Sequence, residues 1–405
     1  MHMHPTSAED SILEGEAGLM ARQLMTRLQP QRWPIPLDRF PTGTVLVGGA
    51  VRDGLLDRLP EHPDLDMIVP ANALGHVRTL AREYGGACVV LDRDRDMARL
   101  VIGSWTIDLA RQDGEDLTAD LLRRDYRINA IALTLTTEPK LLDPSGGIAD
   151  LRDQRITAIR EQNLLDDPLR LLRALRLSAE LSMRIDDATL ELIARYRRQL
   201  PKVAPERIQA ELLKLVQANH PDQAMHLLQA LNLIAPWKAD HPPTKLNAQA
   251  LTRKEQQKAL PLARITQLLS DQGIVDLKFS RKQTQRCMRL RKWWQRDLQL
   301  KVEALDEWER LKLHQELGED LLAFLLTGPI ERQKQWLSRW RNPEDTLFHP
   351  SPPLNGRALQ AELGLSPGPQ LGKLIDHLCL EQAFGRICSR NDAIQCAHAW
   401  INSPL

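Results

Sequence analysis

The chain has 405 residues, of which 42% are hydrophobic, and a formal net charge of +1. This length indicates two to four domains rather than a single core, and the composition excludes a largely disordered chain. The near-neutral charge by itself neither indicates nor excludes a nucleic-acid partner.

Nothing in the sequence predicts a membrane-bound or secreted protein. Even the most apolar stretches contain Arg or Asp, so none has the length of a membrane span. The N-terminus lacks the basic and apolar regions of a signal peptide. The five cysteines are odd in number and form no CxxC pair, as is typical of reduced thiols. We therefore expect a soluble, cytoplasmic protein.

The first 150 residues are expected to form an N-terminal helical segment and then a mixed α/β domain. Leucines at helical spacing predict one helix over residues 7–30. Beyond residue 40, short apolar and β-branched runs surround a helical stretch at 50–58. The strand-like runs are 44–47, 65–69, 87–91, 98–102, 105–109 and 128–135.

After Asp150 the strands are expected to stop, and the rest of the chain is predicted to be helical. Clusters of proline near 236–243 and 342–353 indicate boundaries. The predicted fold class is α+β: a head with a small mixed sheet, followed by an all-helical neck, body and tail. Helical periodicity is clearest at 166–181, 187–196, 205–217 and 224–231. The expected segments are 1–40, 41–150, 151–236, 237–345 and 346–405.

A strongly basic stretch lies within the third quarter of the sequence. Residues 281–301 hold eight Lys and Arg against one acid, Asp297, with Trp293 and Trp294 among them. A basic helix with aromatic side chains could follow a phosphate backbone. The alternative is a solvated helix face whose tryptophans are buried, and the sequence does not choose between the two.

Two features of a candidate active site follow the first strand-like run. Gly48 and Gly49 allow the backbone to approach a ligand, and the following helix offers its N-terminal amides to a phosphate. Arg52, one turn into that helix, can neutralise triphosphate charge. The alternation of the next strand places the carboxylates of Asp64 and Asp66 on one side. Because hard oxygen ligands favour Mg²⁺, we predict that this pair binds magnesium and catalyses nucleotidyl transfer.

A third carboxylate is needed from a neighbouring strand, and Asp108 is the candidate. It stands in the strand-like run 105–109. The alternative is an acid on an edge strand that faces solvent.

Two further segments carry charged residues next to apolar ones. Arg123, Arg124 and Asp125 lead directly into an apolar stretch that contains Asn129, which predicts a site at the edge of an element. By itself this segment identifies no ligand.

The second segment begins with Asp166 and Asp167. Pro168 is suited to the first helical position after an acidic N-cap. Arginines follow at 170, 173 and 176, at three-residue spacing. Without context, a capping acid and solvated arginines explain this pattern as well as a binding site does.

In this order, these segments resemble the class II branch of the CCA-adding enzyme and bacterial poly(A) polymerase family, within the polymerase-β-like nucleotidyltransferases. The match is strongest over 44–216 and resumes at 354–372, whereas 237–345 contains no motif of the family. The resemblance implies that tRNA lies along the helical domains. It also implies addition of C and/or A to the tRNA 3′ end from CTP and ATP, with release of pyrophosphate.

The resemblance also assigns roles to residues. Asp64 and Asp66 would bind the catalytic metal, with Asp108 as the third catalytic carboxylate. Asp167 and Arg170 match the pair that selects the base. A carboxylate accepts from the amino group of cytosine or adenine, and an arginine donates to the ring nitrogen. Arg123, Arg124 and Asp125 match the residues that contact the triphosphate and ribose. With the residues singled out above, the predicted nucleotide-binding set is Gly49, Arg52, Arg123, Arg124, Asp125, Asn129, Asp167, Arg170 and Arg173.

The sequence departs from the family pattern in one respect that bears on the product. Asp108 and Arg123 are only 15 positions apart. Full CCA-adding relatives have a longer flexible segment there, and members that lack it resemble CC-adding enzymes, whose partner enzyme adds the final A. Arg127 replaces a small polar residue, with no assigned role. The alternatives are a poly(A) polymerase, although this chain lacks basic extensions, and a catalytically inactive RNA-binding relative.

Overall fold

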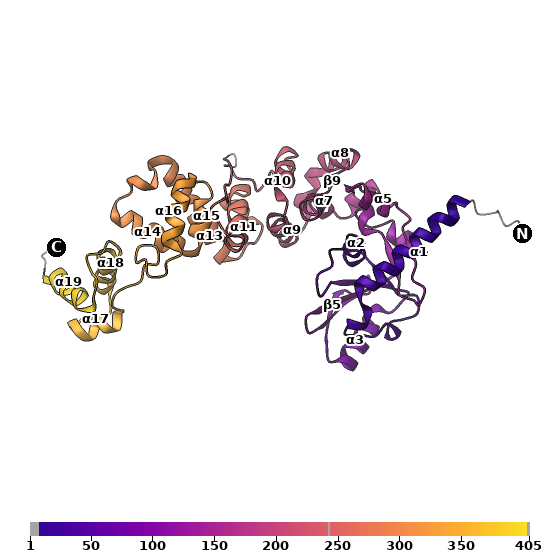
Figure 1. The fold of residues 1–405 in the computed structure, drawn as a ribbon, viewed down its shortest axis with the longest axis horizontal. Helices are drawn as coiled ribbons and strands as arrows, with labels where there is room; N and C mark the ends of the chain where they lie inside the picture. Colours follow the sequence, from indigo (N-terminus) through magenta and orange to yellow (C-terminus); the bar gives the residue numbers. More distant parts are fainter. Residues whose placement is uncertain (1–7, 242–243, 403–405) are drawn as a thin grey trace, which may run out of the picture. The chain divides into compact units, whose positions relative to one another are not determined.

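The computed structural model describes residues 8–241 and 244–402, which fold as two compact units (Figure 1). One unit lies within Met1–Val203 and Ala218–Leu233, and the other within Ala204–Gln217 and Ile234–Leu405. The chain therefore passes from one unit to the other three times. The division of the sequence into five segments stays a prediction. None of the helices in the described ranges is both long and apolar enough to cross a bilayer.

A seven-stranded mixed sheet forms the centre of the first unit, as the α+β prediction requires. Its strand order is β3-β4-β5-β2-β1-β6-β7. All neighbouring strands run antiparallel except β2 and β5, which are parallel. The strands are β1 (Val45–Val47), β2 (Leu65–Val69), β3 (Ala87–Asp92), β4 (Met97–Ile102), β5 (Trp105–Arg111), β6 (Ala132–Thr134) and β7 (Leu141–Leu142).

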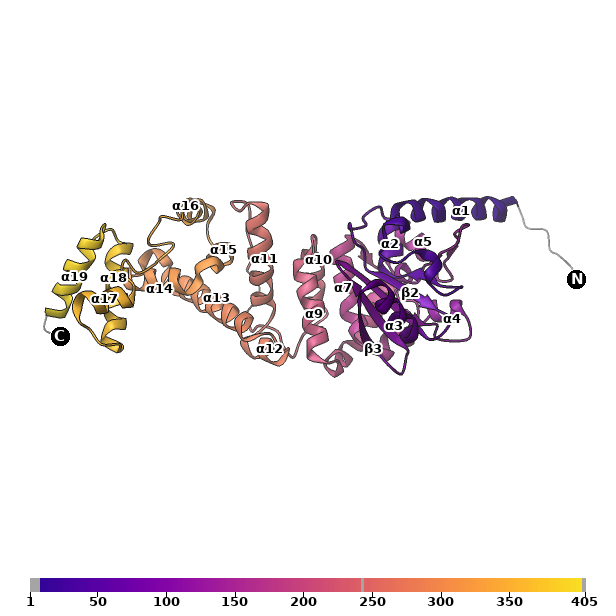
Figure 2. The same ribbon diagram turned by 90° about the horizontal axis from the view of Figure 1, so that it is seen from below.

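Three helices accompany this sheet in the first half of the unit. They are α1 (Ala8–Leu28), α2 (Gly49–Leu55) and α3 (Ala73–Tyr84), and α3 lies against the sheet (Figure 2). The apolar face of α3 is buried, with Val77 and Leu80 almost fully covered. α1 packs on α2 so closely that a Cβ on Gly54 would lie 2.2 Å from a Leu24 methyl carbon. The Arg27 guanidinium fixes this contact by donating to the Gly54 carbonyl at 2.8 Å.

Two sequence expectations for this unit were wrong. Residues 128–135 do not form one strand, because a 3-10 turn at Arg127–Asn129 precedes the short β6. Strands also continue after Asp150, since β8 (Arg155–Ile156) and β9 (Arg184–Ile185) pair in parallel. Strands of two residues leave no periodic signal in the sequence. The remaining helices are α4 (Leu117–Leu121), α5 (Gly147–Arg152), α6 (Glu161–Asp166), α7 (Leu169–Leu181), α8 (Asp187–Tyr196) and α10 (Pro221–Ala230).

The described part of the second unit consists of helices. α9 (Pro205–Gln217) belongs to it and packs on α11, where Arg264 donates to the Val216 carbonyl at 2.8 Å. The helices that follow are α11 (Arg253–Leu268), α12 (Asp271–Asp276), α13 (Arg281–Leu300), α14 (Glu307–Leu317), α15 (Leu321–Leu325), α16 (Ile330–Trp340), α17 (Gly356–Leu363), α18 (Pro369–Ala383) and α19 (Arg390–Asn402).

The basic stretch is helix α13, and much of its charge is neutralised inside the unit. Trp293 is buried, and its indole nitrogen donates to Glu316 at 2.8 Å. Four cations of the helix pair with acids of the same unit, which supports the solvated helix face. These pairs are Arg286–Asp320, Arg291–Asp271, Lys292–Glu316 and Arg296–Glu309. Contact of residues 237–345 with RNA stays a prediction.

His314 on α14 is a buried titratable group. Its side chain is 2% exposed, and its ring centre lies 4.1 Å from that of Phe348. Burial, assisted by the nearby Arg339 and Arg310 and opposed by Asp345, lowers the pKa of His314 to about 3. The unfolded chain, with a histidine pKa of about 6.5, therefore binds more protons than the folded chain below pH 6.5.

Because the neutral ring favours the folded state, stability should fall as the pH drops from about 6.5 towards 3. Between pH 7 and pH 5 we expect the free energy of unfolding to decrease by about 2 kcal/mol. The measurement is urea unfolding followed by tryptophan fluorescence. His314→Leu should remove this part of the pH dependence, whereas the exposed His398→Gln should preserve it. Equal slopes for both variants would contradict the assignment.

Candidate active site

Register in the sheet brings two predicted catalytic residues side by side. Asp66 on β2 is paired with Asp108 on the parallel strand β5 and with Val47 on the antiparallel strand β1. Asp64 lies just before β2, two positions from Asp66, so the alternation of an extended chain directs both carboxylates to one side. Strand β2, which carries Asp66, therefore lies between β5, which carries Asp108, and β1, which leads into the Gly48-Gly49 turn.

These carboxylates create a negative environment. Burial is the main factor that raises the pKa of Asp66, to about 6, and the charges of Asp108 and Asp64 add to it. Arg124 and Arg173 act in the opposite direction. Such a pair of oxygen-rich side chains suits a hard divalent cation. However, within residues 8–241 and 244–402 no three acidic, His or Cys side chains are close enough to enclose an ion.

Arg99 pairs with one of these carboxylates, Asp108, and the sequence analysis did not identify it. Its guanidinium binds both oxygens of Asp108, with Nε–Oδ1 and Nη2–Oδ2 distances of 2.8 Å each. Arg99 is directly opposite Asp108 in the antiparallel β4–β5 pair. Aligning the two strand-like runs about the turn at Gly103 would have predicted this pairing. A cation that uses Asp108 must share its carboxylate with Arg99.

Gly48 lets the turn after β1 approach the Asp66 carboxylate. Its φ of +73° lies in a region that residues with a side chain rarely adopt. A Cβ at this position would lie 3.0 Å from Asp66 Oδ2. The next residue, Gly49, begins α2. Gly48 thus permits close approach to a site carboxylate, and the approach of the Gly-Gly backbone to a ligand stays a prediction.

Gly48→Ala should therefore damage the site more than the fold. We expect a loss of about 1–3 kcal/mol in stability from the strained φ, and a loss of nucleotide incorporation of at least tenfold because the added methyl displaces Asp66. The comparison is Gly85→Ala, whose φ is +72° and whose Cβ would contact nothing within 4 Å. Thermal unfolding and incorporation should fall together for Gly48→Ala, and only stability for Gly85→Ala.

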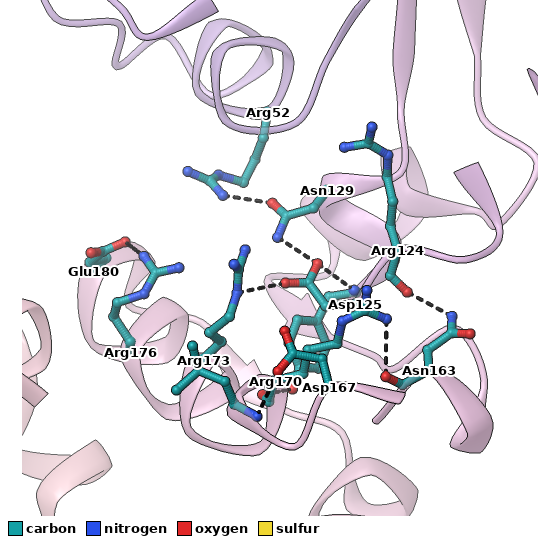
Figure 3. A network of polar contacts seen from close by, with 12 residues as sticks. Arg52, Arg124, Asp125, Asn129, Asn163, Asp167, Arg170, Arg173, Arg176 and Glu180 are labelled. Carbon is teal, nitrogen blue, oxygen red and sulfur yellow. Dashed lines mark hydrogen bonds and ion pairs between the residues drawn. The ribbon is translucent and has the colours of Figure 1, made fainter. Parts of the chain in front are cut away.

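A chain of side-chain contacts links α2 to α7 across the site (Figure 3). Arg52 donates to the Asn129 amide oxygen at 2.6 Å, and Asn129 donates to Asp125 at 3.0 Å. The other Asp125 oxygen pairs with Arg173 Nε at 2.9 Å. Although burial opposes ionisation, Arg173 and Asn129 lower the pKa of Asp125 to about 2. Four predicted nucleotide-binding residues therefore form one charged network.

The two arginines that precede Asp125 are held by acids from the α4 region. Arg123 pairs with Asp113 at 2.5 Å, and Arg124 lies 3.6 Å from Asp120. The backbone amide of Asp113 donates to the Asp120 carboxylate at 2.8 Å, so Asp120 also holds the backbone that carries Asp113. The short segment after β5 is thus folded onto the Arg-Arg-Asp motif.

The start of α7, the helix predicted to select the base, differs in detail from the prediction. Pro168 is the cap residue, and α7 begins at Leu169. Asp167 still caps this end, because its carboxylate accepts from the Leu169 amide at 3.2 Å. Asp167 is also the residue that terminates α6. The helix predicted over 166–181 therefore begins later, at Leu169, and Asp166 is the last residue of α6.

A cleft of about 670 Å³ contains most of the predicted site. Eight arginines and seven aspartates line it, which suits a ligand with several phosphates held beside cationic and acidic groups. All nine predicted nucleotide-binding residues and Asp66 are in its lining, whereas Asp64 and Asp108 are not. The predicted residues in the lining are Gly49, Arg52, Asp66, Arg123, Arg124, Asp125, Asn129, Asp167, Arg170 and Arg173.

Two stretches of the chain match known protein families. Residues 44–157 match the poly A polymerase head domain, and residues 182–238 match the "Probable RNA and SrmB- binding site of polymerase A". The chain is also 30% identical to a CC-adding tRNA nucleotidyltransferase of Synechocystis sp., with 90% of this chain and 95% of the relative covered. The chain belongs to the class II CCA-adding enzyme and bacterial poly(A) polymerase family.

Other members of this family carry different activities in their names. An A-adding tRNA nucleotidyltransferase of Deinococcus radiodurans is 29% identical over 90% of this chain and 97% of its own length. The chain is thus an enzyme of the nucleotidyltransferase class, whose members use divalent metal ions. The names of the relatives do not by themselves identify the nucleotide that this member adds.

Solved structures of CCA-adding enzymes share the fold. One determined with CTP has a TM-score of 0.72 and 20% identity, covering 95% of this chain and 99% of its own. The Thermotoga maritima CCA-adding enzyme with tRNA has a TM-score of 0.68 and 21% identity, covering 98% and 97%. These likenesses bear out the head, neck, body and tail fold predicted from the sequence.

Proposed function

We propose that this protein is a CC-adding tRNA nucleotidyltransferase. It would transfer cytidylate from CTP to the 3′ end of tRNA without a nucleic-acid template, and release pyrophosphate. In each step the 3′ oxygen of the RNA forms a bond to the α-phosphorus of CTP, and the bond from that phosphorus to the bridging oxygen breaks. The family membership and the names of the relatives support the general reaction.

The observation that carries the choice of CC addition is the segment between Asp108 and Arg123. It spans 15 positions and runs from the end of β5 through a short loop into α4. Asp116 caps α4 by accepting from the Ala119 amide at 2.7 Å, and Asp113 binds Arg123. A segment this short, part of which is the capped helix α4, lacks the length of the mobile element that helps CCA-adding relatives to switch from C to A.

The divalent ion that we propose is Mg²⁺, held by Asp64 and Asp66. When bound, it would polarise the triphosphate and lower the pKa of the attacking hydroxyl group. The donor set fits, because the carboxylates of Asp64 and Asp66 provide hard oxygen ligands and the raised pKa of Asp66 reflects burial and neighbouring negative charge. Asp108 would orient this pair from β5 while Arg99 holds its carboxylate.

The remaining site residues would bind and select the nucleotide. Arg52, Arg123 and Arg124 line the cleft and would neutralise the triphosphate. Asp167 would accept from the exocyclic amino group of the base, and Arg170 would donate to the ring nitrogen. Uracil has a carbonyl oxygen and an N–H group at these positions, so both contacts would fail.

Four tRNA transcripts, lacking 0, 1, 2 or 3 terminal nucleotides, test the proposal. Each is incubated with the protein, Mg²⁺, CTP and ATP, and the products are sequenced. We expect transcripts lacking two or three nucleotides to gain C residues and stop at CC. Addition of A to a transcript ending in CC would instead indicate a full CCA-adding enzyme.

One further incubation distinguishes tRNA-specific C addition from the poly(A) polymerase alternative, which the relatives do not favour. An unstructured RNA incubated with ATP should gain no nucleotides. A CC-adding enzyme requires a second enzyme to supply the terminal A, so we propose an A-adding tRNA nucleotidyltransferase in the same cell. Both would work in the cytoplasm, where tRNA and nucleoside triphosphates meet.

A further inference from the structure

Asn163 is a buried polar side chain that none of the motif assignments uses. It lies on α6 and is 4% exposed. Its side-chain nitrogen donates to the Leu122 carbonyl at 2.9 Å and to the Arg124 carbonyl at 2.7 Å. An amide NH₂ group has two hydrogens, so both are used on the segment that carries the Arg-Arg-Asp motif.

The same residue also holds the base-selecting arginine (Figure 3). The backbone carbonyl of Asn163 accepts from Arg170 Nη1 at 3.0 Å, and this nitrogen also donates to the Arg123 carbonyl at 2.9 Å. Three successive carbonyls, 122 to 124, are thus held by side chains from α6 and α7. On the other side, the Tyr126 hydroxyl donates to the Arg170 carbonyl at 2.5 Å.

These contacts fix the orientation of a planar group. A guanidinium is a rigid fork, so holding Nη1 against two carbonyls sets the plane of the other two nitrogens. Arg170 lines the cleft, and among the described residues no acceptor binds its Nε or Nη2. The backbone carbonyls of Arg123 and Asn163 therefore fix the direction of these two donors, which the flexible arginine side chain alone would not.

We propose that Asn163 is a positioning residue that couples the triphosphate-binding segment to the base-selecting arginine. The inference rests on the proposed function and assigns Asn163 a part in choosing cytosine over uracil. It acts through Arg123, Arg124 and Arg170 and makes no contact with the nucleotide itself. Loss of its amide would loosen the segment and Arg170 together.

Asn163→Asp tests this, because the carboxylate keeps the shape of the amide but cannot donate to the Leu122 and Arg124 carbonyls. The loss of two buried hydrogen bonds should lower kcat/KM for CTP at least tenfold. We expect the ratio of kcat/KM for CTP to that for UTP also to fall about tenfold, because misplacing Arg170 weakens only the contacts that distinguish the bases. Asn163→Ala should lower the ratio in the same direction.

The matched control is Gln162→Glu, which makes the same amide-to-acid change one residue earlier on α6. Gln162 is exposed, and its amide reaches only Asp166, at 2.8 Å. This variant should keep the CTP-to-UTP ratio of the unaltered protein. The ratio does not depend on how much of a variant is folded, so partial unfolding of Asn163→Asp would lower both rates and leave it unchanged.

An unchanged ratio in Asn163→Asp and Asn163→Ala would overturn the inference. A second overturning result is an equal fall of the ratio in Gln162→Glu, since the effect would then come from charge near α6. Failure of the proposed function looks different. In that case the unaltered protein would add no C to tRNA, whatever stands at position 163.

Discussion

Replacing Asp66 by Asn should reduce nucleotide incorporation by at least about 10³-fold. The side chain lies at the centre of the site, beside Asp108 and 3.0 Å from the space that a Cβ on Gly48 would occupy. An amide supplies one neutral oxygen in place of a charged carboxylate, so the proposed divalent ion loses a ligand and several kcal/mol of transition-state stabilisation. The measurement is single-turnover addition of C to a tRNA transcript.

The same substitution should leave binding of the nucleotide largely intact. Arg52, Arg123 and Arg124 remain in the cleft, so CTP affinity measured by calorimetry without metal should change little. The control is Asp57→Asn, an exposed aspartate that pairs with Arg27 at 3.3 Å outside the cleft. Activity of Asp66→Asn within tenfold of the unaltered protein would show that this carboxylate is not a metal ligand.

Arg170→Ala should reduce selectivity for CTP over UTP by about 10²-fold. In the proposed function the arginine would supply the donors that recognise the ring nitrogen of cytosine, and a buried donor facing a wrong base costs several kcal/mol. Primer extension with CTP or UTP alone gives the ratio. Half-saturation by Mg²⁺ should not move, since Asp64 and Asp66 are untouched.

Arg184→Ala is the comparison for this variant, because Arg184 is exposed on β9 in the same unit. It should preserve both the selectivity and the Mg²⁺ dependence. If Arg170→Ala changes the Mg²⁺ dependence and keeps the CTP-to-UTP ratio, Arg170 acts on the metal site and not on the base.

Local signals in the sequence were sufficient to predict the central strands and the order of the site motifs. Strand β2 has the predicted bounds, and α9 spans the predicted 205–217. β2 is a short, nearly continuous apolar run, and α9 carries a periodicity of about 3.6 residues. The Gly-Gly turn was predictable for a different reason: only glycine tolerates the positive φ of Gly48 without strain.

Contacts between segments far apart in the sequence were not predictable in this way. The Asn163 contacts join residues 39 and 41 positions apart, whereas the missed Arg99–Asp108 pair joins two strands connected by a short turn and could have been found from their alignment. β8 and β9 form only because α7 turns the chain back beside them. The sequence therefore predicted about half of the charged residues that line the cleft, and the structure adds the others and the neighbours that orient them.

The threefold passage of the chain between its two units limits how the protein can be divided. α9 belongs to the second unit, whereas α10, only a few residues later, packs on α7 in the first. Neither unit is one continuous piece of polypeptide, so a single cut releases neither intact. A fragment that ends after residue 203 lacks α10, and one that begins at 234 lacks α9. Exchanging either unit with that of a relative would require splicing at three positions in the gene, and both units should be expressed together.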